Sequence, residues 1–221
     1  MNMVGMLLDL LKTKEQKEKA KLQDTIINII YNKFDDVVIH GGTAVWRCYG
    51  GERFSKDIDL YVPTANGAKK IILEIKRNGL RCEEKQLRKT RKGIINPFIV
   101  GSYYDVKLDF NIVHKSYRFY YGDYLMASSG IRKVITLYPE ELIVEKIMAY
   151  EDRQEARDVY DIWILSGKAD LQPIGTELRR FISDLKAPKN YRELADTVYG
   201  FCPTFEQMQA DILRRVHEVR K

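Results

Sequence analysis

The side chains best suited to chemistry are two aspartates, Asp57 and Asp59, in the segment KDIDLYVP. This segment alternates between polar and apolar residues, which predicts a β-strand with one buried face. Residues two apart on a strand project from the same face, so the two carboxylates lie close together and repel unless a cation separates them. Mg²⁺ prefers oxygen ligands and is commonly held by one or two carboxylates together with substrate phosphates. Most isolated pairs of this kind are surface acids, so the neighbouring residues decide what the pair means.

A pair of glycines, Gly41 and Gly42, precedes the aspartates at the end of the apolar run 37–39. The segment TAVWRCYG that follows is typical of a short helix that begins near Thr43. A strand that runs through glycines into a helix offers free backbone N–H groups and the positive end of the helix dipole, which together can bind phosphate. A glycine pair by itself is usually a turn. Beside the carboxylates, it predicts half of a phosphoryl-transfer site.

A third carboxylate is expected from a neighbouring strand, and Asp109 is the best candidate. It lies in YYDVKLDFNIV, a second alternating segment with apolar residues on one face and Asp105, Lys107 and Asp109 on the other. An acid on such a strand needs a functional reason. Asp105 shares the face and is the competing candidate.

The order and spacing of these motifs, hGG[TS]A followed by RxSxDIDL, resemble the DNA polymerase β-like nucleotidyltransferase superfamily. The pattern is more similar to the AbiEii toxin family, whose members include abortive-infection and type IV toxin–antitoxin toxins. The resemblance covers about residues 36–165. Many superfamily members have Ser at the position of Thr43, and since the hydroxyl is kept, the same contact to a triphosphate oxygen is expected. The matching residues are Gly42, Thr43, Asp57 and Asp59 in the first motif, Arg53 and Ser55 before it, Asp109 in the second, and Lys146, Arg153, Arg157, Asp158 and Asp161 in the third.

The resemblance implies an α+β fold: a polymerase-β-like nucleotidyltransferase domain with a mixed sheet flanked by helices, followed by a helical C-terminal domain. It implies transfer of a nucleoside monophosphate from an NTP to an acceptor hydroxyl, with Mg²⁺ or Mn²⁺ as the cofactor. The expected acceptor is tRNA, and a cognate antitoxin protein is an expected partner. A small-molecule or protein acceptor, or a nucleotide- or RNA-binding module without catalysis, is the alternative. The implied catalytic residues are Asp57, Asp59, Asp109 and Lys146; the metal ligands are Asp57, Asp59 and Asp109; the nucleotide-binding residues are Gly41, Gly42, Thr43, Arg53, Ser55, Arg153, Asp158 and Asp161.

The third motif can also be interpreted from its spacing. Lys146 and Arg153 are seven residues apart and share a helix face, from which Lys146 could reach the β- or γ-phosphate. Asp158 and Asp161 could hold Arg153 or Arg157 in place. The alternative is a ladder of surface salt bridges. Arg53 could likewise form only a structural ion pair with an acid of the site.

The remaining pattern divides the chain at about residue 136. Residues 1–136 are expected to form the α/β domain with an N-terminal helical region in 4–33, and residues 137–221 the helical domain. Further expectations are a helix over 66–78, paired strands at 80–88 and 94–100, a last strand at 131–137, and helices from Glu140 onward that break near Gly167, Pro173, Pro188 and Pro203.

Composition narrows the class of protein. The chain has 221 residues, 45% of them hydrophobic, and a net charge of +6. A basic segment, 69–92, fits an RNA acceptor or a solvated surface equally well. Three scattered cysteines and three scattered histidines predict free thiols and no zinc site, and the chain is expected to be cytoplasmic without a membrane span. The aromatic residues that could stack on bases or belong to a β-region are Tyr117, Phe119, Tyr120, Tyr121 and Tyr124.

Overall fold

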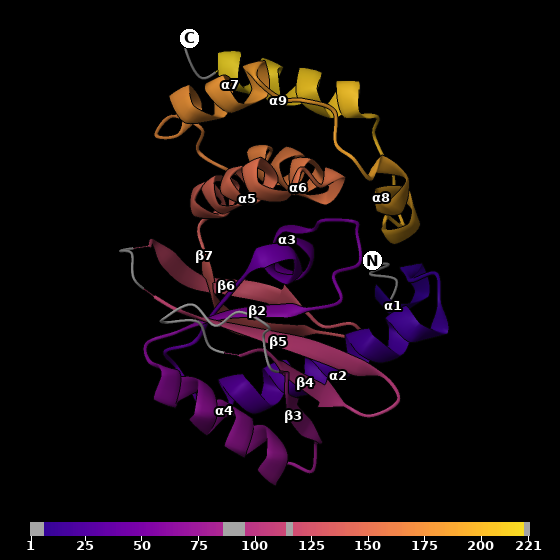
Figure 1. Ribbon diagram of the computed structural model, residues 1–221, viewed down its shortest axis with the longest axis vertical. Helices are drawn as coiled ribbons and strands as arrows, with labels where there is room; N and C mark the ends of the chain where they lie inside the picture. Colours follow the sequence, from indigo (N-terminus) through magenta and orange to yellow (C-terminus); the bar gives the residue numbers. More distant parts are fainter. Residues whose placement is uncertain (1–6, 86–95, 114–116, 219–221) are drawn as a thin grey trace.

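A central mixed sheet organises the protein, for which a computed structural model describes residues 7–85, 96–113 and 117–218 (Figure 1). Within these residues the sheet has seven strands in the order β3-β4-β5-β2-β1-β7-β6. The strands are β1 (Val38–His40), β2 (Ile58–Val62), β3 (Cys82–Glu84), β4 (Phe98–Gly101), β5 (Asp105–Ile112), β6 (Phe119–Leu125) and β7 (Ile131–Leu137).

The centre of the sheet is built from β5, β2, β1 and β7. β2 runs parallel to β5 and antiparallel to β1, and β1 runs parallel to β7. The outer pairs β3–β4, β4–β5 and β6–β7 are antiparallel. Both β2 and β5 alternate between buried and half-buried residues, as the sequence predicts. The buried positions pack into the core, so the polar positions of both strands share the opposite face.

Helices cover both faces of this sheet. α2 (Lys14–Tyr31) and α4 (Ala65–Arg77) lie side by side on one face, and α3 (Gly41–Tyr49) lies on the other (Figure 1). α2 follows the short α1 (Leu7–Leu10) and begins with a capping box, in which Thr13 and Gln16 bond each other's backbone N–H groups. These local signals explain why the helices begin where they do.

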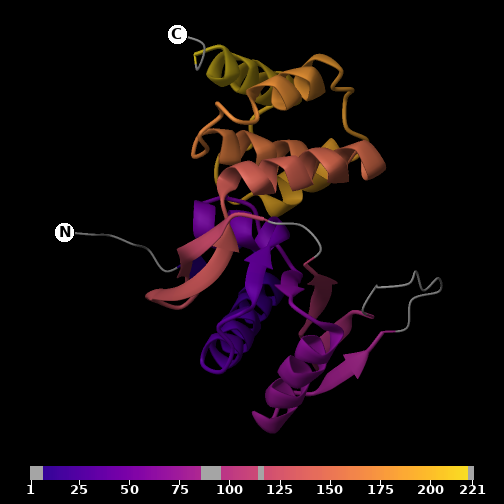
Figure 2. The ribbon, with the colours of Figure 1, turned by 90° about the vertical axis from the view of Figure 1, so that its left-hand side faces the viewer.

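The C-terminal part is helical and stacks above α3, as both views show (Figures 1 and 2). Its elements are α5 (Pro139–Arg153), α6 (Ala156–Ser166), α7 (Gly175–Ser183), α8 (Tyr191–Thr197) and α9 (Phe205–Glu218). α3 contacts α5 and α6, and α9 packs on α6 and α7. One buried apolar cluster extends from the sheet through α3 into these helices. No helix among the described residues is both long and apolar enough to cross a membrane.

Three features differ from the sequence expectations. For the aromatic residues around β6, the sequence offered a β-region only as one alternative and gave no strand bounds, whereas β6 pairs along its whole length with β7. α3 begins at Gly41, so the glycines form the first turn of the helix and do not precede it. α5 and α6 are separated at Gln154, whose φ of 56° ends the first helix. The turn expected between the paired strands includes residues 86–95, which lie outside the described ranges, as do 1–6 and 114–116.

Candidate active site

Three carboxylates and one lysine share a face at the centre of the sheet. Asp59 on β2 and Asp109 on β5 are register partners in the parallel pair. Asp57 directly precedes β2, and Lys107 lies two residues before Asp109 on the same face of β5. The strand register therefore brings together three acids that are up to 52 residues apart in the chain. Asp105, the competing candidate, pairs instead with Lys19 at 3.3 Å and does not line the cavity described below.

Charge is concentrated in this group. Lys107 Nζ lies 2.5 Å from Asp109 Oδ2. Burial raises the pKa of Asp57 and of Asp109, and repulsion from neighbouring aspartates adds to this, while Lys107 lowers both pKa values only in part. Burial lowers the pKa of Lys107, but its hydrogen bond to Asp109 and the surrounding acids outweigh burial and raise it. The cluster is therefore short of positive charge in the absence of a metal ion.

The two glycines allow α3 to start directly against the acids. Gly41 has a φ of 67°, and a Cβ at this position would lie 2.1 Å from Asp59 Oδ2. A Cβ on Gly42 would lie 2.7 Å from Arg53 Nη2 and 2.8 Å from Ser55 Oγ. Any side chain here would displace the acid or the arginine, so the close approach requires glycine at both positions.

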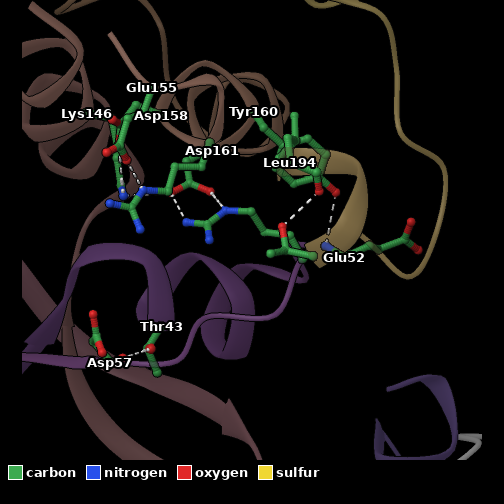
Figure 3. Close-up of polar contacts among 12 residues, drawn as sticks. Thr43, Glu52, Asp57, Lys146, Glu155, Asp158, Tyr160, Asp161 and Leu194 are labelled. Carbon is green, nitrogen blue, oxygen red and sulfur yellow. Dashed lines mark hydrogen bonds and ion pairs between the residues drawn. The ribbon is translucent and has the colours of Figure 1, made fainter. Parts of the chain in front are cut away.

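The Thr43 hydroxyl does not face the cavity, although the resemblance implies that it contacts a triphosphate oxygen. The side chain of Thr43 is fully buried, and its hydroxyl donates to the backbone carbonyl of Asp57, as Figure 3 shows. It is not among the residues that line the cavity. The hydroxyl therefore positions the strand that carries Asp57, and contact with a triphosphate would require a different arrangement.

A buried charge network links the loop before β2 to the C-terminal helices (Figure 3). Arg53 donates two hydrogen bonds of 2.7 Å to Asp161 on α6, one to each carboxylate oxygen. Lys146 Nζ on α5 lies 2.6 Å from the same carboxylate and 3.5 Å from Asp158. Burial opposes ionisation of Asp161, but Arg53 and Lys146 outweigh it and lower the pKa of Asp161. The ion pair expected for Arg53 is thus formed with an acid of the third motif.

The third-motif arginines are oriented by neighbouring acids, and Glu155 contacts both of them. Arg153 donates to Asp158 at 2.7 and 2.6 Å, a bidentate pair in which Asp158 is fully buried. Arg157 lies 2.5 Å from Glu155, a residue that the sequence did not single out. Both arginines remain partly exposed, with more than a third of each side chain open to solvent. Their guanidinium groups are therefore held in place and still accessible to a ligand.

A cavity of about 470 Å³ brings these groups together. The residues that the sequence predicted and that line the cavity are Gly42, Arg53, Ser55, Asp57, Asp59, Asp109, Lys146, Arg153 and Arg157. Gly41, Thr43, Asp158 and Asp161 are not part of its lining. Its wall also includes residues that the sequence analysis did not propose for the site: Lys56, Lys107 and Glu155, and Asn190, Glu193, Leu194 and Thr197 around α8. The α8 segment is fixed by backbone hydrogen bonds, Phe54 N–H to the Thr197 carbonyl and Tyr199 N–H to the Glu52 carbonyl.

The acidic wall has the chemistry of a Mg²⁺ site, because its three carboxylates offer only oxygen ligands. Within the described ranges, no three His, Cys, Asp or Glu side chains are gathered closely enough to hold a metal ion as they stand. Lys107 occupies the space beside Asp109 in this arrangement. The donor set fits the ion, and a shift of Lys107 would open the position.

Comparison with known proteins identifies the fold and the family. Two solved structures from Helicobacter pylori resemble the chain: the crystal structure of JHP933 (TM-score 0.63, 17% identity, 95% of this chain and 93% of that chain covered) and a protein assigned provisionally as a nucleotidyltransferase (TM-score 0.63, 17% identity, 94% and 96% covered). At this identity the likeness concerns the fold alone, and it defines an α+β nucleotidyltransferase fold with C-terminal helices. A family model described as "Nucleotidyl transferase AbiEii toxin, Type IV TA system" matches residues 29–201. The chain therefore belongs to the AbiEii nucleotidyltransferase toxin family. A comparison with curated protein sequences finds no match.

Proposed function

We propose that the protein is a metal-dependent nucleotidyltransferase that moves a nucleoside monophosphate from an NTP to an acceptor hydroxyl and releases pyrophosphate. One observation carries the proposal: a single cavity brings three carboxylates from the sheet side together with Lys146, Arg153 and Arg157 from the helical side. The carboxylates are Asp57, Asp59 and Asp109. This arrangement suits a triphosphate, which needs a metal ion held by carboxylates and cationic donors for its phosphate oxygens.

On the sheet side, Asp57, Asp59 and Asp109 would hold Mg²⁺, or Mn²⁺ in its place. The bound ion would neutralise triphosphate charge and activate the acceptor hydroxyl. Asp109 accepts the proton of this hydroxyl as its oxygen bonds the α-phosphorus and the bond to pyrophosphate breaks. Gly42 lies in the first turn of α3 and lines the cavity, where a free backbone N–H would bind the leaving phosphates.

On the helical side, basic groups hold the triphosphate and offset the charge that develops on pyrophosphate. Arg153 and Arg157 are partly exposed and are oriented by Asp158 and Glu155. Lys146 lines the cavity while it is bonded to Asp158 and Asp161, and an ammonium has three donors, so one remains for a phosphate oxygen. Together these groups position the substrate without forming a covalent intermediate.

For the acceptor we propose the 3′ end of tRNA, and for the biological role a toxin that a cognate antitoxin protein restrains. The support is family membership, the net charge of +6, and exposed lysines and arginines on α4. Phe119 and Tyr121 on β6 are exposed and could stack on bases, whereas Tyr124 is buried in the core. We also propose a cytoplasmic location, and a division at residue 136 into an α/β domain and a helical domain that share one core.

The test is incubation of the purified protein with each α-³²P-labelled NTP, Mg²⁺ and total cellular RNA. Wild type should label tRNA-sized RNA, and the Asp57→Ala/Asp59→Ala variant should lose about a thousandfold or more of the rate. Asp105→Ala is the matched control, because Asp105 is an acid on the same face of β5 outside the cavity. It should keep its activity. An Asp105→Ala variant as inactive as the double variant would contradict the assignment of Asp109.

The other outcomes separate the alternatives. NTP binding without transfer to RNA would identify a small-molecule or protein acceptor. NTP binding that needs no Mg²⁺ and never yields pyrophosphate would indicate a binding module. Absence of NTP binding would overturn the proposed reaction.

A further inference from the structure

Lys107 stands where a cation is needed among the acids. On adjacent parallel strands, Asp59 and Asp109 are register partners, and the same register continued two residues back sets Lys107 beside Asp57. Four side chains thus form a block of three acids and one ammonium on one face of the sheet. Lys107 Nζ contacts Asp109 Oδ2 at 2.5 Å.

This contact competes with a metal ion at Asp109. An ammonium at 2.5 Å from a carboxylate oxygen fills the space that a Mg²⁺ ion about 2.0–2.1 Å from the same oxygen would require. The two cations would also repel at such a separation. Lys107 therefore weakens metal binding at Asp109 for as long as it holds this position.

The nucleotide offers a route for this exchange. The side chain of Lys107 is 35% exposed and lines the cavity, so it can swing toward a bound triphosphate without unpacking the core. A triphosphate brings negative charge for the ammonium and further oxygen ligands for the metal ion. Both changes favour the release of Lys107 from Asp109.

We infer that Lys107 is a built-in competitor of the divalent ion: it occupies the acidic cluster of the free protein and yields to the ion when a nucleoside triphosphate binds. This inference rests on the proposed function, since it concerns the same metal and the same substrate. Its consequence is that the free protein binds divalent ions weakly and acquires its metal together with the nucleotide.

The test measures metal binding without turnover, by electron paramagnetic resonance of Mn²⁺ titrated into the nucleotide-free protein. Lys107→Met should bind Mn²⁺ about tenfold more tightly than wild type, because the competing charge is gone. Lys56→Met is the first control. Lys56 lines the same cavity, and none of the ion pairs found among the described residues involves it, so its removal measures the general effect of one positive charge fewer.

Lys133→Met is the second control. Lys133 makes an equally short strand contact, 2.5 Å to Asp123, but far from the cavity and more exposed. Lys133→Met should leave Mn²⁺ affinity unchanged.

Asp109→Asn in the Lys107→Met background should remove the gain in Mn²⁺ affinity, because Lys107 and the ion compete at Asp109. Circular dichroism checks that each variant is folded, and Lys107→Gln replaces Lys107→Met if the latter does not fold.

A second measurement repeats the titration with a saturating, non-hydrolysable NTP analogue. The difference between wild type and Lys107→Met should then shrink, because the triphosphate has already displaced Lys107. Equal Mn²⁺ affinity of Lys107→Met, Lys56→Met and wild type without nucleotide would overturn the inference, and so would a difference that persists undiminished with the analogue. The labelling assay is independent of both results, so failure of the competition leaves nucleotide transfer separately decidable.

Discussion

At the scale of single residues, Asp161 is central to the structure, because its fully buried carboxylate forms ion pairs with both Arg53 and Lys146. Asp161→Asn would leave these two cations with too little negative charge in a buried site. Breaking a buried ion pair from one side typically costs about 3–5 kcal/mol, so the free energy of unfolding should fall by about that amount. Chemical denaturation measures it, and the melting temperature should drop by about 10 °C.

The control for this variant is Asp123→Asn. Asp123 pairs with Lys133 at the surface, and an exposed pair contributes only about 0–1 kcal/mol. If Asp161→Asn proved as mild as this control, the network would not hold the loop and the helices together.

Asp161 also makes the free energy of unfolding depend on pH. The pKa of Asp161 is lowered in the folded protein, so its ionised form stabilises the fold above the unfolded-state pKa of about 3.9, and this contribution is lost as the pH falls through the lower folded-state value. The stability difference between wild type and Asp161→Asn should therefore be constant near neutral pH and shrink only in strongly acidic solution. Denaturation at a series of pH values measures it, and a difference that already narrows near pH 6 would contradict the lowered pKa.

A substitution at Thr43 can distinguish two roles of its hydroxyl, which either positions Asp57 or binds the triphosphate directly. Its buried hydroxyl donates to the carbonyl of Asp57, and Thr43→Val would leave that carbonyl without this donor, at a cost of about 1–3 kcal/mol. We expect kcat to fall about tenfold as Asp57 shifts, with the Kd for NTP unchanged. Thr43→Ser should retain both values. A weakened Kd in Thr43→Val with normal kcat would instead indicate a direct contact with the triphosphate.

At the scale of elements, the junction between β1 and α3 depends on the absence of a side chain at Gly41. Gly41→Ala combines a positive φ, which costs about 1 kcal/mol or more, with a Cβ that meets Asp59. Nucleotide transfer should fall by about a hundredfold or more, because Asp59 is displaced. Gly50→Ala is the control: its φ is also positive, 70°, but a Cβ there would meet nothing within 4 Å. It should cost stability without affecting activity, and equal activity of the two variants would argue against the close packing on Asp59.

The elements also explain what the sequence could predict. Alternation around Asp57 to Leu60 and around Asp109 is local, so it correctly predicted both strands and the shared face of their acids. That β2 and β5 are neighbours depends on long-range pairing, which no local pattern encodes. The bounds of β6 were not predicted because YYGDY mixes aromatic residues with a glycine and an acid, and its alternation becomes clear only beside β7.

The wall of the cavity near α8 could not be predicted either, and the reason is again long-range pairing. Asn190 and Glu193 carry no motif, and they join the site only because the chain returns after α7 and pairs with the segment near Phe54. Lys107 was visible beside Asp109, but its contact with that acid depends on how its side chain turns. Types and spacing therefore predict which residues can react, whereas the tertiary fold decides which of them meet.

At the scale of the whole molecule, the sheet and the C-terminal helices share one core. α3 packs on the sheet and contacts both α5 and α6, and the same buried cluster includes Val45 on α3, Ile143 on α5 and Ile162 on α6. The ion pair between Arg53 and Asp161 crosses the same boundary. The site is assembled only when both parts are in place, because Asp59 and Asp109 come from the sheet, and Lys146 and Arg153 come from the helices.

This shared core predicts that residues 1–138 do not fold alone, although the sequence changes character close to that point. Removal of α5 and α6 would expose the apolar side of α3 and would take away Asp161, the partner of Arg53. The fragment should therefore bind a hydrophobic dye and melt without a cooperative transition. Circular dichroism and calorimetry measure this. Addition of the fragment 139–221 should restore a cooperative transition, because the two surfaces are complementary. A cooperative transition in the first fragment by itself would instead indicate an autonomous domain, in which the helices complete the active site without contributing to the folding of the sheet.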